Sequence, residues 1–159
     1  MKMKFSSFFY RFFIVGLFIA PLIFSSCQKS SSPAADNRPY TVSGNASGSQ
    51  VVPALPDSAT ATITGTYNPA NHVLNYTSNW TNLSGTPLSA GFYTGAPGAS
   101  GVAVGNAWQV SGGPTGTITG NVTITDDQAA QLLAGNFYYT YATAKHPSGE
   151  IRGQVSVSR

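Results

Sequence analysis

The chain of 159 residues is 42% hydrophobic and 12% aromatic, but only 8% of its residues are charged, against about 25% in a typical soluble domain. Its formal net charge of +3 belongs to the amino terminus, through Lys2, Lys4 and Arg11, because five basic and five acidic residues balance in the rest of the chain. This balance leaves no basic patch for nucleic acid and no polybasic surface for lipid headgroups. We therefore expect no nucleic-acid partner.

The first residues have the layout of a secretory signal peptide. Basic residues precede an apolar run over residues 12–24, and two serines then lead to Cys27. The run is shorter than the roughly 20 residues of a membrane-spanning helix, and Pro21 interrupts it. The sequence therefore predicts a cleaved signal peptide over residues 1–26, with an uncleaved amino-terminal anchor as the alternative.

Cys27 is the only cysteine in the chain, so it cannot form an internal disulfide in an exported protein. Its place directly after the apolar run resembles a bacterial lipobox, with Phe24 where leucine is commoner. The resemblance implies that Cys27 is lipidated and that the chain is attached to a membrane through this lipid. Gln28, in place of an aspartate, resembles the sorting signal for the outer membrane, so we expect an outer-membrane lipoprotein of the bacterial envelope. The small polar residues 27–39 then form a flexible tether.

Short alternating runs with regular spacing follow from residue 40 onward. Apolar residues alternate with threonines over residues 59–67, a turn sequence occupies residues 68–71, and a second alternating run covers residues 73–80. Together these predict a β-hairpin. Further strands are expected from runs at residues 88–92, 102–110 and 117–124. No β–α–β spacing separates the runs, which indicates an antiparallel sheet.

The carboxyl-terminal residues predict one helix and two closing strands. Thr125 is placed to cap the start of the helix, and Gly135 follows where a left-handed residue commonly ends one. Alternation over residues 137–142 predicts the first closing strand. The second is expected over residues 149–157, with a buried face that consists of Ile151, Val155 and Val157.

We therefore predict one all-β domain over residues 40–159. It is expected to be a single antiparallel β-sandwich of Greek-key or immunoglobulin-like type, with one short helix before the last two strands. A domain of this size buries enough surface to fold without a disulfide.

The carboxyl-terminal part contains Gln-Leu-Leu-Ala-Gly-Asn-Phe-Tyr at residues 131–138 and His-Pro-Ser-Gly-Glu-Ile-Arg-Gly-Gln at residues 146–154. These two stretches resemble the closing signature of the CHRD domain, a module named after chordin that also occurs in bacterial secreted proteins and lipoproteins. Residues 48–53 are similar to the opening segment of the family, with Val51 where an acidic residue is usual. Leu83-Ser84-Gly85 and residues 95–101 are similar to its middle. The resemblance covers residues 40–157.

The resemblance also bears on metal binding. Typical CHRD domains carry a His-x-His pair and a further histidine, at positions that here are Gly91, Tyr93 and Ala142. A loose similarity to copper–zinc superoxide dismutase sandwiches suggests that those histidines bind a metal, so the resemblance implies that this chain has lost that set. The two histidines present, His72 and His146, are both expected to be exposed beside or within turns. We therefore expect no cofactor, with a superoxide-dismutase-like redox metalloenzyme as an alternative.

The tyrosines suggest a second alternative function, that of a binding surface. If Phe137, Tyr139 and Tyr141 face the core, then Tyr138 faces outward. Exposed tyrosines beside asparagine and threonine suit a carbohydrate-binding or protein-binding surface, so Tyr138 and Tyr93 are candidate binding residues. Packing in the core, with the phenol hydrogen-bonded, is the competing interpretation.

The turn and strand at residues 146–152 are interpreted as structural. Pro147 restricts the backbone and Gly149 permits a left-handed conformation, so the two set the register of the last strand. Arg152 is expected to hold Glu150 or a backbone carbonyl through its planar guanidinium. His146 is expected to have no partner.

The sequence contains no Gly-x-Ser-x-Gly motif, no phosphate-binding loop and no cysteine placed as a nucleophile in the domain. We therefore expect no enzymatic activity. The expected function is that of an envelope-anchored, non-catalytic interaction or structural module, with a protein or a glycan as its partner.

Overall fold

The computed structural model describes residues 36–159, so the predicted signal peptide, Cys27 and most of the predicted tether lie outside the described residues. None of the helices in this part has the length and hydrophobicity of a membrane-spanning segment. The elements in chain order are β1 (Tyr40–Ser47), the 3₁₀ helix η1 (Gly48–Gln50), β2 (Thr60–Asn68), β3 (Val73–Thr81), β4 (Pro87–Thr94), β5 (Val102–Val104), β6 (Gly116–Thr123), α1 (Asp126–Leu133), β7 (Phe137–Thr143), β8 (Ile151–Gln154) and β9 (Ser156–Ser158).

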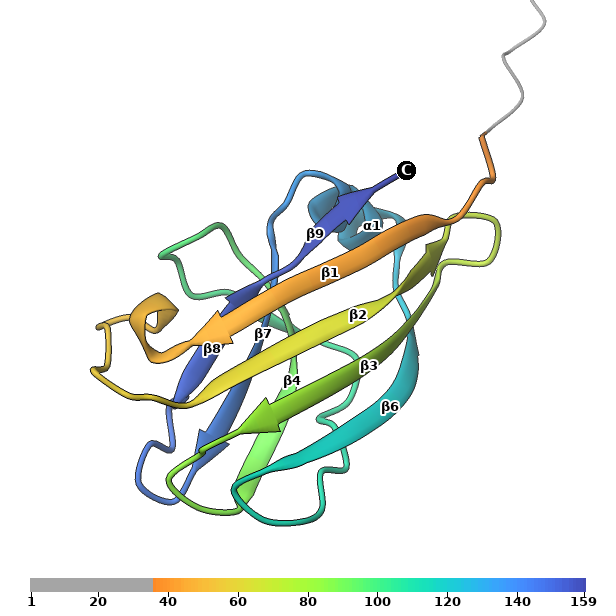
Figure 1. Cartoon of the computed structure of the whole chain (residues 1–159). Helices are drawn as coiled ribbons and strands as arrows, with labels where there is room; N and C mark the ends of the chain where they lie inside the picture. The colour runs from red at the N-terminus through yellow and green to blue at the C-terminus, as the bar shows by residue number, and fades with distance from the viewer. Residues whose placement is uncertain (1–35) are drawn as a thin grey trace, which may run out of the picture. The chain divides into compact units, whose positions relative to one another are not determined.

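The strands form one antiparallel sheet in the order β5-β4-β7-β8-β1-β2-β3-β6, and β9 pairs with β1. In Figure 1 the strands β1, β2, β3 and β6 cross the front, and β8, β7 and β4 lie behind them, so the sheet is curled into a half-barrel. The prediction of an antiparallel all-β domain with one short helix before the closing strands is confirmed. The two separate sheets of the predicted sandwich are not seen, because β8 pairs with β7 on one side and with β1 on the other. That shared strand keeps front and back in one sheet.

The predicted hairpin is confirmed as β2 and β3, which pair from Thr60↔Thr81 to Asn68↔Val73. Alternation places one side of each strand in the core. The buried side of β2 carries Ala61, Ile63 and Tyr67, and that of β3 carries Leu74, Tyr76, Ser78 and Trp80.

Tyrosines of β7 reach across the interior to the front strands. The Tyr139 hydroxyl donates to the carbonyl oxygens of Ala61 at 3.0 Å and of Gly44 at 3.3 Å. The Tyr141 hydroxyl donates to Ser78 Oγ at 2.8 Å, and Ser78 Oγ donates in turn to the backbone of β2 at 3.0 Å. Both tyrosines are fully buried, as the alternation in β7 predicts. These bonds hold the back of the half-barrel to its front.

The strand predicted over residues 102–110 ends at Val104. Gly105 has a φ of +68°, a left-handed conformation that ends the regular pairing with β4, although the Trp108 N–H still donates to the Ala90 carbonyl of β4 at 2.8 Å. Residues 105–110, which we call the seam segment, then run towards β6. Trp108 of this segment is buried against Tyr76, at a ring-centroid distance of 4.7 Å, and against Phe92, at 4.9 Å. The seam segment therefore covers the open side of the half-barrel.

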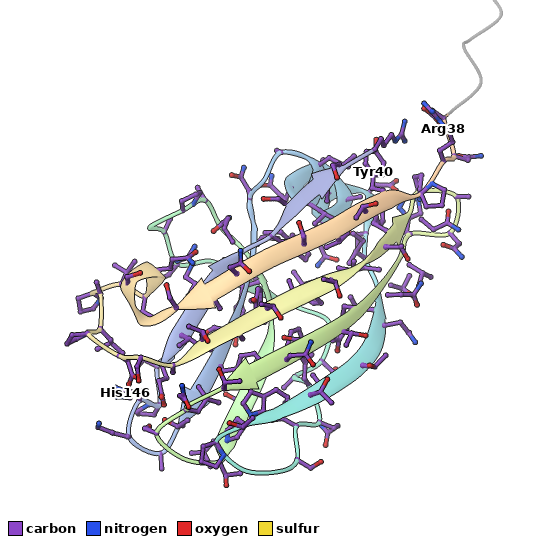
Figure 2. All side chains as sticks on the ribbon, viewed as in Figure 1. Arg38, Tyr40 and His146 are labelled. Atoms are coloured by element: carbon purple, nitrogen blue, oxygen red, sulfur yellow. The ribbon has the colours of Figure 1, made fainter. Side chains whose placement is uncertain are left out.

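The outer face of the front strands carries short uncharged side chains in register. Each cross-strand row is made almost entirely of serine, threonine and asparagine, and Figure 2 shows such side chains standing on the front strands. We call this the hydroxyl–amide face; its rows are Ser156–Ser43–Thr64–Thr77–Thr119, Ser158–Thr41–Thr66–Asn75–Asn121 and Asn45–Thr62–Asn79–Thr117. Neighbouring hydroxyls contact each other, as Thr77 Oγ1 and Thr119 Oγ1 do at 3.1 Å.

The predicted helix cap is confirmed. Thr125 and Gln128 form a reciprocal capping box at the start of α1, and Gly135 follows the helix with a φ of +77°. The predicted last strand is divided at Val155, whose N–H donates to the Phe137 carbonyl at 2.8 Å. Ile151 and Val155 are fully buried as predicted, whereas Val157 is only partly buried. Leu88 also departs from its strand pattern and is 67% exposed, because the register shifts between Pro87 and Ser89.

Replacement of Gly153 by alanine tests the crossing of β7, β8 and β1. A Cβ atom at Gly153 would lie 2.7 Å from Tyr139 Cε1 and 2.8 Å from the Asn45 carbonyl oxygen. Overpacking of this kind costs about 1–3 kcal/mol, so Gly153→Ala is expected to lower the free energy of unfolding by that amount in urea denaturation. Gly85→Ala is the matched control, since a Cβ atom there meets nothing within 4 Å. Equal stability of the two variants would contradict the close crossing.

Candidate functional site

The carboxylate of Glu150 is fully buried and is held by hydroxyl and amide donors. Ser84 donates to it twice, from its backbone nitrogen and from its hydroxyl, each at 2.6 Å, and the Thr143 hydroxyl donates to it as well. Buried carboxylates are costly unless their oxygens are hydrogen-bonded. Glu150 thus joins the turn before β8 to the Leu83-Ser84-Gly85 stretch.

Arg152 does not pair with Glu150, so one of the two expected partners is wrong. Its side chain is buried, and Nη2 donates to the Ala96 carbonyl oxygen at 2.8 Å, which is the other expected partner. Its guanidinium carbon lies 3.7 Å from the centroid of the Tyr138 ring, a cation–π contact. Burial lowers the pKa of Arg152. Arg152 therefore holds the loop at residues 95–101 against the outer side of β7.

The expectation that Tyr138 is exposed is wrong. Tyr138 does lie on the opposite side of β7 from Tyr139, but only 7% of its surface is exposed. Its ring stacks on Tyr93 at a centroid distance of 5.3 Å, and its hydroxyl accepts a hydrogen bond from the Gly101 N–H at 3.2 Å. The loop and Arg152 cover the ring, which leaves Tyr93 as the half-exposed member of the pair.

Both histidines face an aspartate. His146 Nε2 lies 3.9 Å from Asp57 Oδ2, and its side chain is 22% exposed. The expectation that His146 is exposed and without a partner is therefore wrong; it lies in the turn between β7 and β8, near the lower left of Figure 2. His72 is 38% exposed, with Nε2 3.3 Å from Asp126 Oδ1 and Nδ1 3.2 Å from the Tyr67 hydroxyl.

The positions where the resemblance implies histidines come together on one side of the sheet. Gly91 and Tyr93 lie in β4, and Ala142 lies in the neighbouring β7, where the pairs Gly91↔Thr140 and Ser89↔Ala142 are adjacent. Alternation puts all three on the face opposite the buried Phe92 and Tyr141. Within residues 36–159, no group of three or more histidine, cysteine or acidic residues is arranged to hold a metal.

The turn before β8 has the backbone features that its sequence predicts. Gly149 has a φ of +124°, a conformation that favours glycine. Its N–H donates to the His146 carbonyl at 3.1 Å, and the Glu150 N–H donates to the Tyr141 carbonyl at 2.7 Å. Pro147, which lies between His146 and Gly149 in this turn, is exposed.

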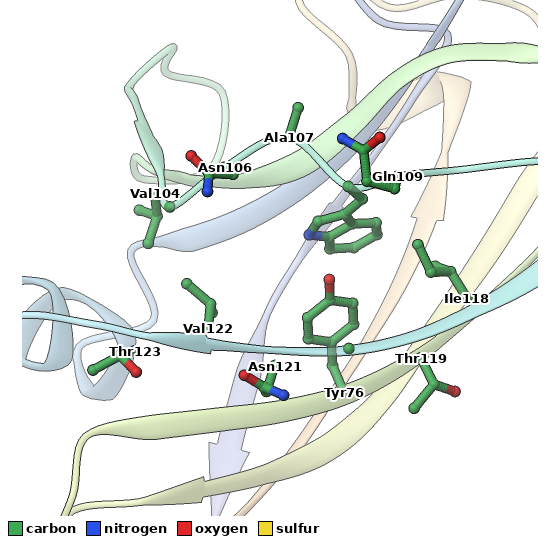
Figure 3. A pocket seen from close by; sticks show the side chains of 13 residues that line it. Tyr76, Val104, Asn106, Ala107, Gln109, Ile118, Thr119, Asn121, Val122 and Thr123 are labelled. Atoms are coloured by element: carbon green, nitrogen blue, oxygen red, sulfur yellow. The ribbon is translucent and has the colours of Figure 1, made fainter.

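A pocket lies between β6 and the seam segment (Figure 3), and we call it the seam pocket. Its volume is about 540 Å³, within the range of small-ligand sites. Figure 3 shows Tyr76 pointing from β3 into the pocket, with Ile118 and Val122 beside it on β6. The lining residues are Tyr76, residues 104–109 and residues 118–123, and none of them is charged.

The polar ends of the two buried aromatic residues in the seam pocket have no partner within the described part of the chain. The hydroxyls of Tyr139 and Tyr141 are hydrogen-bonded, and the Trp80 indole donates to the Gly113 carbonyl at 3.2 Å. Tyr76 and Trp108 are 6% and 7% exposed and make no such bond. Every fully buried side-chain nitrogen or oxygen in residues 36–159 has a partner, so these two groups open to the pocket.

The environment of Tyr76 keeps its hydroxyl neutral. Burial alone raises its pKa, so the phenol stays protonated and can both donate and accept a hydrogen bond. The position depends on Gly120, where a Cβ atom would lie 2.7 Å from the Tyr76 hydroxyl. The sequence predicts strands over residues 73–80 and 102–110, which contain Tyr76 and Trp108, and does not predict the pocket. The signal that was available is a tryptophan between Asn106 and Gln109 in a stretch without strand alternation.

A family model, that of the CHRD domain, matches residues 42–155. No curated protein and no solved structure matches the chain.

The contact between Glu150 and Ser84 predicts a coupled loss of stability. Glu150→Gln is expected to lower the free energy of unfolding by about 1–3 kcal/mol, because an amide nitrogen cannot accept the bonds that Ser84 and Thr143 donate. Ser84→Ala is expected to cost less in the Glu150→Gln background than in the parent protein. A double-mutant cycle in urea measures both effects. Additive losses would mean that the two residues act independently.

Proposed function

The chain belongs to the CHRD family, and on that premise we propose that it is an exported, lipid-anchored protein whose domain binds a neutral ligand without catalysing a reaction. The proposal has two parts, the anchor and the binding site, which rest on different residues and are tested separately.

The anchor part rests on the amino-terminal sequence. Basic residues, a short apolar run and a single cysteine follow one another in the order of a lipoprotein leader. In this proposal Cys27 carries the lipid, residues 28–39 hold the domain away from the membrane, and Gln28 directs the protein to the outer membrane of a bacterial envelope.

Cys27→Ser is expected to release the protein from the membrane, because the lipid is its attachment. Fractionation of cells, with mass spectrometry of the amino terminus, measures both location and lipidation. Ser26→Ala is the control, since a small residue before the cysteine keeps the leader layout. Membrane retention of Cys27→Ser with an uncleaved leader would instead favour a helical amino-terminal anchor.

The binding part rests on one observation above all: the Tyr76 hydroxyl and the Trp108 indole N–H are accessible from the uncharged seam pocket and have no hydrogen-bond partner among the described residues. Polar groups that open into a pocket beside aromatic and apolar side chains can bond to a ligand, which supports a binding site here. The lining carries no charge, which supports a neutral ligand. Its one titratable side chain, Tyr76, is a phenol with a raised pKa, which suits hydrogen bonding better than proton abstraction.

The two other functions considered have less support. A superoxide-dismutase-like metalloenzyme needs imidazoles where this chain has Gly91, Tyr93 and Ala142, and its two histidines each face an aspartate. A glycan surface built on Tyr138 is disfavoured by the burial of that ring under Arg152.

A thermal-shift screen tests the binding site. The purified full-length lipoprotein would be challenged with neutral polar molecules (sugars, polyols and blocked dipeptides) and with anionic and cationic molecules of similar size. Neutral compounds are expected to raise the melting temperature, and Tyr76→Phe, which removes only the hydroxyl, is expected to reduce the shift. Tyr93→Phe is the control on another face. Stabilisation by charged compounds alone, or by none, would contradict the proposal.

A further inference from the structure

We infer that the seam pocket is a saccharide site, which takes one or two sugar residues of a neutral glycan between β6 and the seam segment. This inference rests on the proposed binding function and names the chemical class of its ligand. The candidate glycan-binding residues are then Tyr76 and Trp108, in place of Tyr93 on β4 and Tyr138 on β7.

The shape of the seam pocket favours a compact ligand. All of its lining residues except Tyr76 come from the continuous stretch 104–123. At one end the backbone of Gly105 lies against Val122, so closely that a Cβ atom on Gly105 would be 2.6 Å from Val122 Cγ2. At the other end the chain itself turns from the seam segment into β6, and this turn is tied down by the bond from the Leu83 N–H to the Pro114 carbonyl at 3.0 Å. A ligand therefore enters from the side and cannot run through.

The two closed ends of the seam pocket favour a sugar over an extended peptide as its ligand. Among the described residues β6 pairs with β3 alone, and a free strand edge can accept a peptide strand. A strand added to β6 would need both ends of the seam pocket to be open. A peptide terminus would fit the enclosed shape but carries a charge, and the lining offers no charged partner. A neutral ring with hydroxyl groups meets both conditions.

The chemistry of the lining matches the two faces of a sugar ring. The Tyr76 hydroxyl can donate or accept, the Trp108 indole donates, and the Asn106 amide does both. Alternate residues of β6 direct their backbone N–H and C=O groups to the free edge, which adds donors and acceptors of both kinds. Ile118 and Val122 are partly buried apolar residues on the same wall, where carbon–hydrogen groups of a sugar can pack. Anions, by contrast, would find no cation there.

Tryptophan fluorescence measures the binding directly, because Trp108 lies in the seam pocket. The full-length lipoprotein, in a detergent without a sugar headgroup, would be titrated with maltose, cellobiose, lactose and N,N′-diacetylchitobiose up to tens of millimolar. At least one disaccharide is expected to give a saturable change. Tyr76→Phe should weaken that binding roughly three- to tenfold, as the loss of one hydrogen bond requires. Gly120→Ala, which crowds the Tyr76 hydroxyl, should weaken it as well, and Tyr93→Phe should leave it unchanged.

The outcomes separate this inference from the function on which it rests. Binding of a disaccharide that neither Tyr76→Phe nor Gly120→Ala weakens would overturn the assignment of the site. If N-acetyl-alanyl-alanine amide binds in a Tyr76-dependent way and no disaccharide binds, the saccharide inference is wrong and the proposed binding function stands. If no neutral probe binds, both are wrong.

Discussion

Two phenol hydroxyls that cross the interior hold this sheet in its curled form. Tyr139 and Tyr141 stand on β7 at the back, and their hydroxyls bond to Ala61, Gly44 and Ser78 on the front strands. A tyrosine ring is long enough to span the core, and its hydroxyl must find a partner once it is buried. The spacing between front and back is therefore set by the length of one side chain. Trp108 fills the remaining open side, where its ring stacks on Tyr76 and both residues line the seam pocket.

In this chain, residues of the CHRD closing signature form hydrogen bonds to loops that are distant in sequence. Glu150 accepts from Ser84, Arg152 donates to Ala96, and Gln154 donates to the Gly95 and Gly135 carbonyls at 2.9 Å and 2.8 Å. Each of these hydrogen bonds reaches a segment whose sequence also resembles the family. The motif residues thus share a structural reason for standing together: β8 and the turn before it reach three loops, and their polar side chains bond to the backbone of those loops.

Local patterns were sufficient for the hairpin of β2 and β3, for the capped helix α1 and for the buried face of β7, because alternation and capping depend on residues close in sequence. They failed where a distant segment decides the outcome. Tyr138 alternates outward, as predicted, yet the loop at residues 95–101 and Arg152 cover it. Glu150 and Arg152 are near in sequence but do not pair. Glu150 instead accepts a hydrogen bond from Ser84, and Arg152 donates one to the Ala96 carbonyl. The seam pocket could not be predicted either, since it needs the left-handed turn at Gly105 to bring Trp108 beside Tyr76.

The hydroxyl–amide face has a consequence for how this domain meets its surroundings. Serine, threonine and asparagine do not titrate, and across the rows of this face there is no charge for salt to screen. A protein near zero net charge ordinarily loses the electrostatic repulsion that keeps copies apart. On this face, contacts between copies would involve neutral hydrogen-bonding groups, which carry no charge in dilute or concentrated salt or across the physiological pH range. Changes of salt or pH therefore leave unchanged the chemical groups that this face presents.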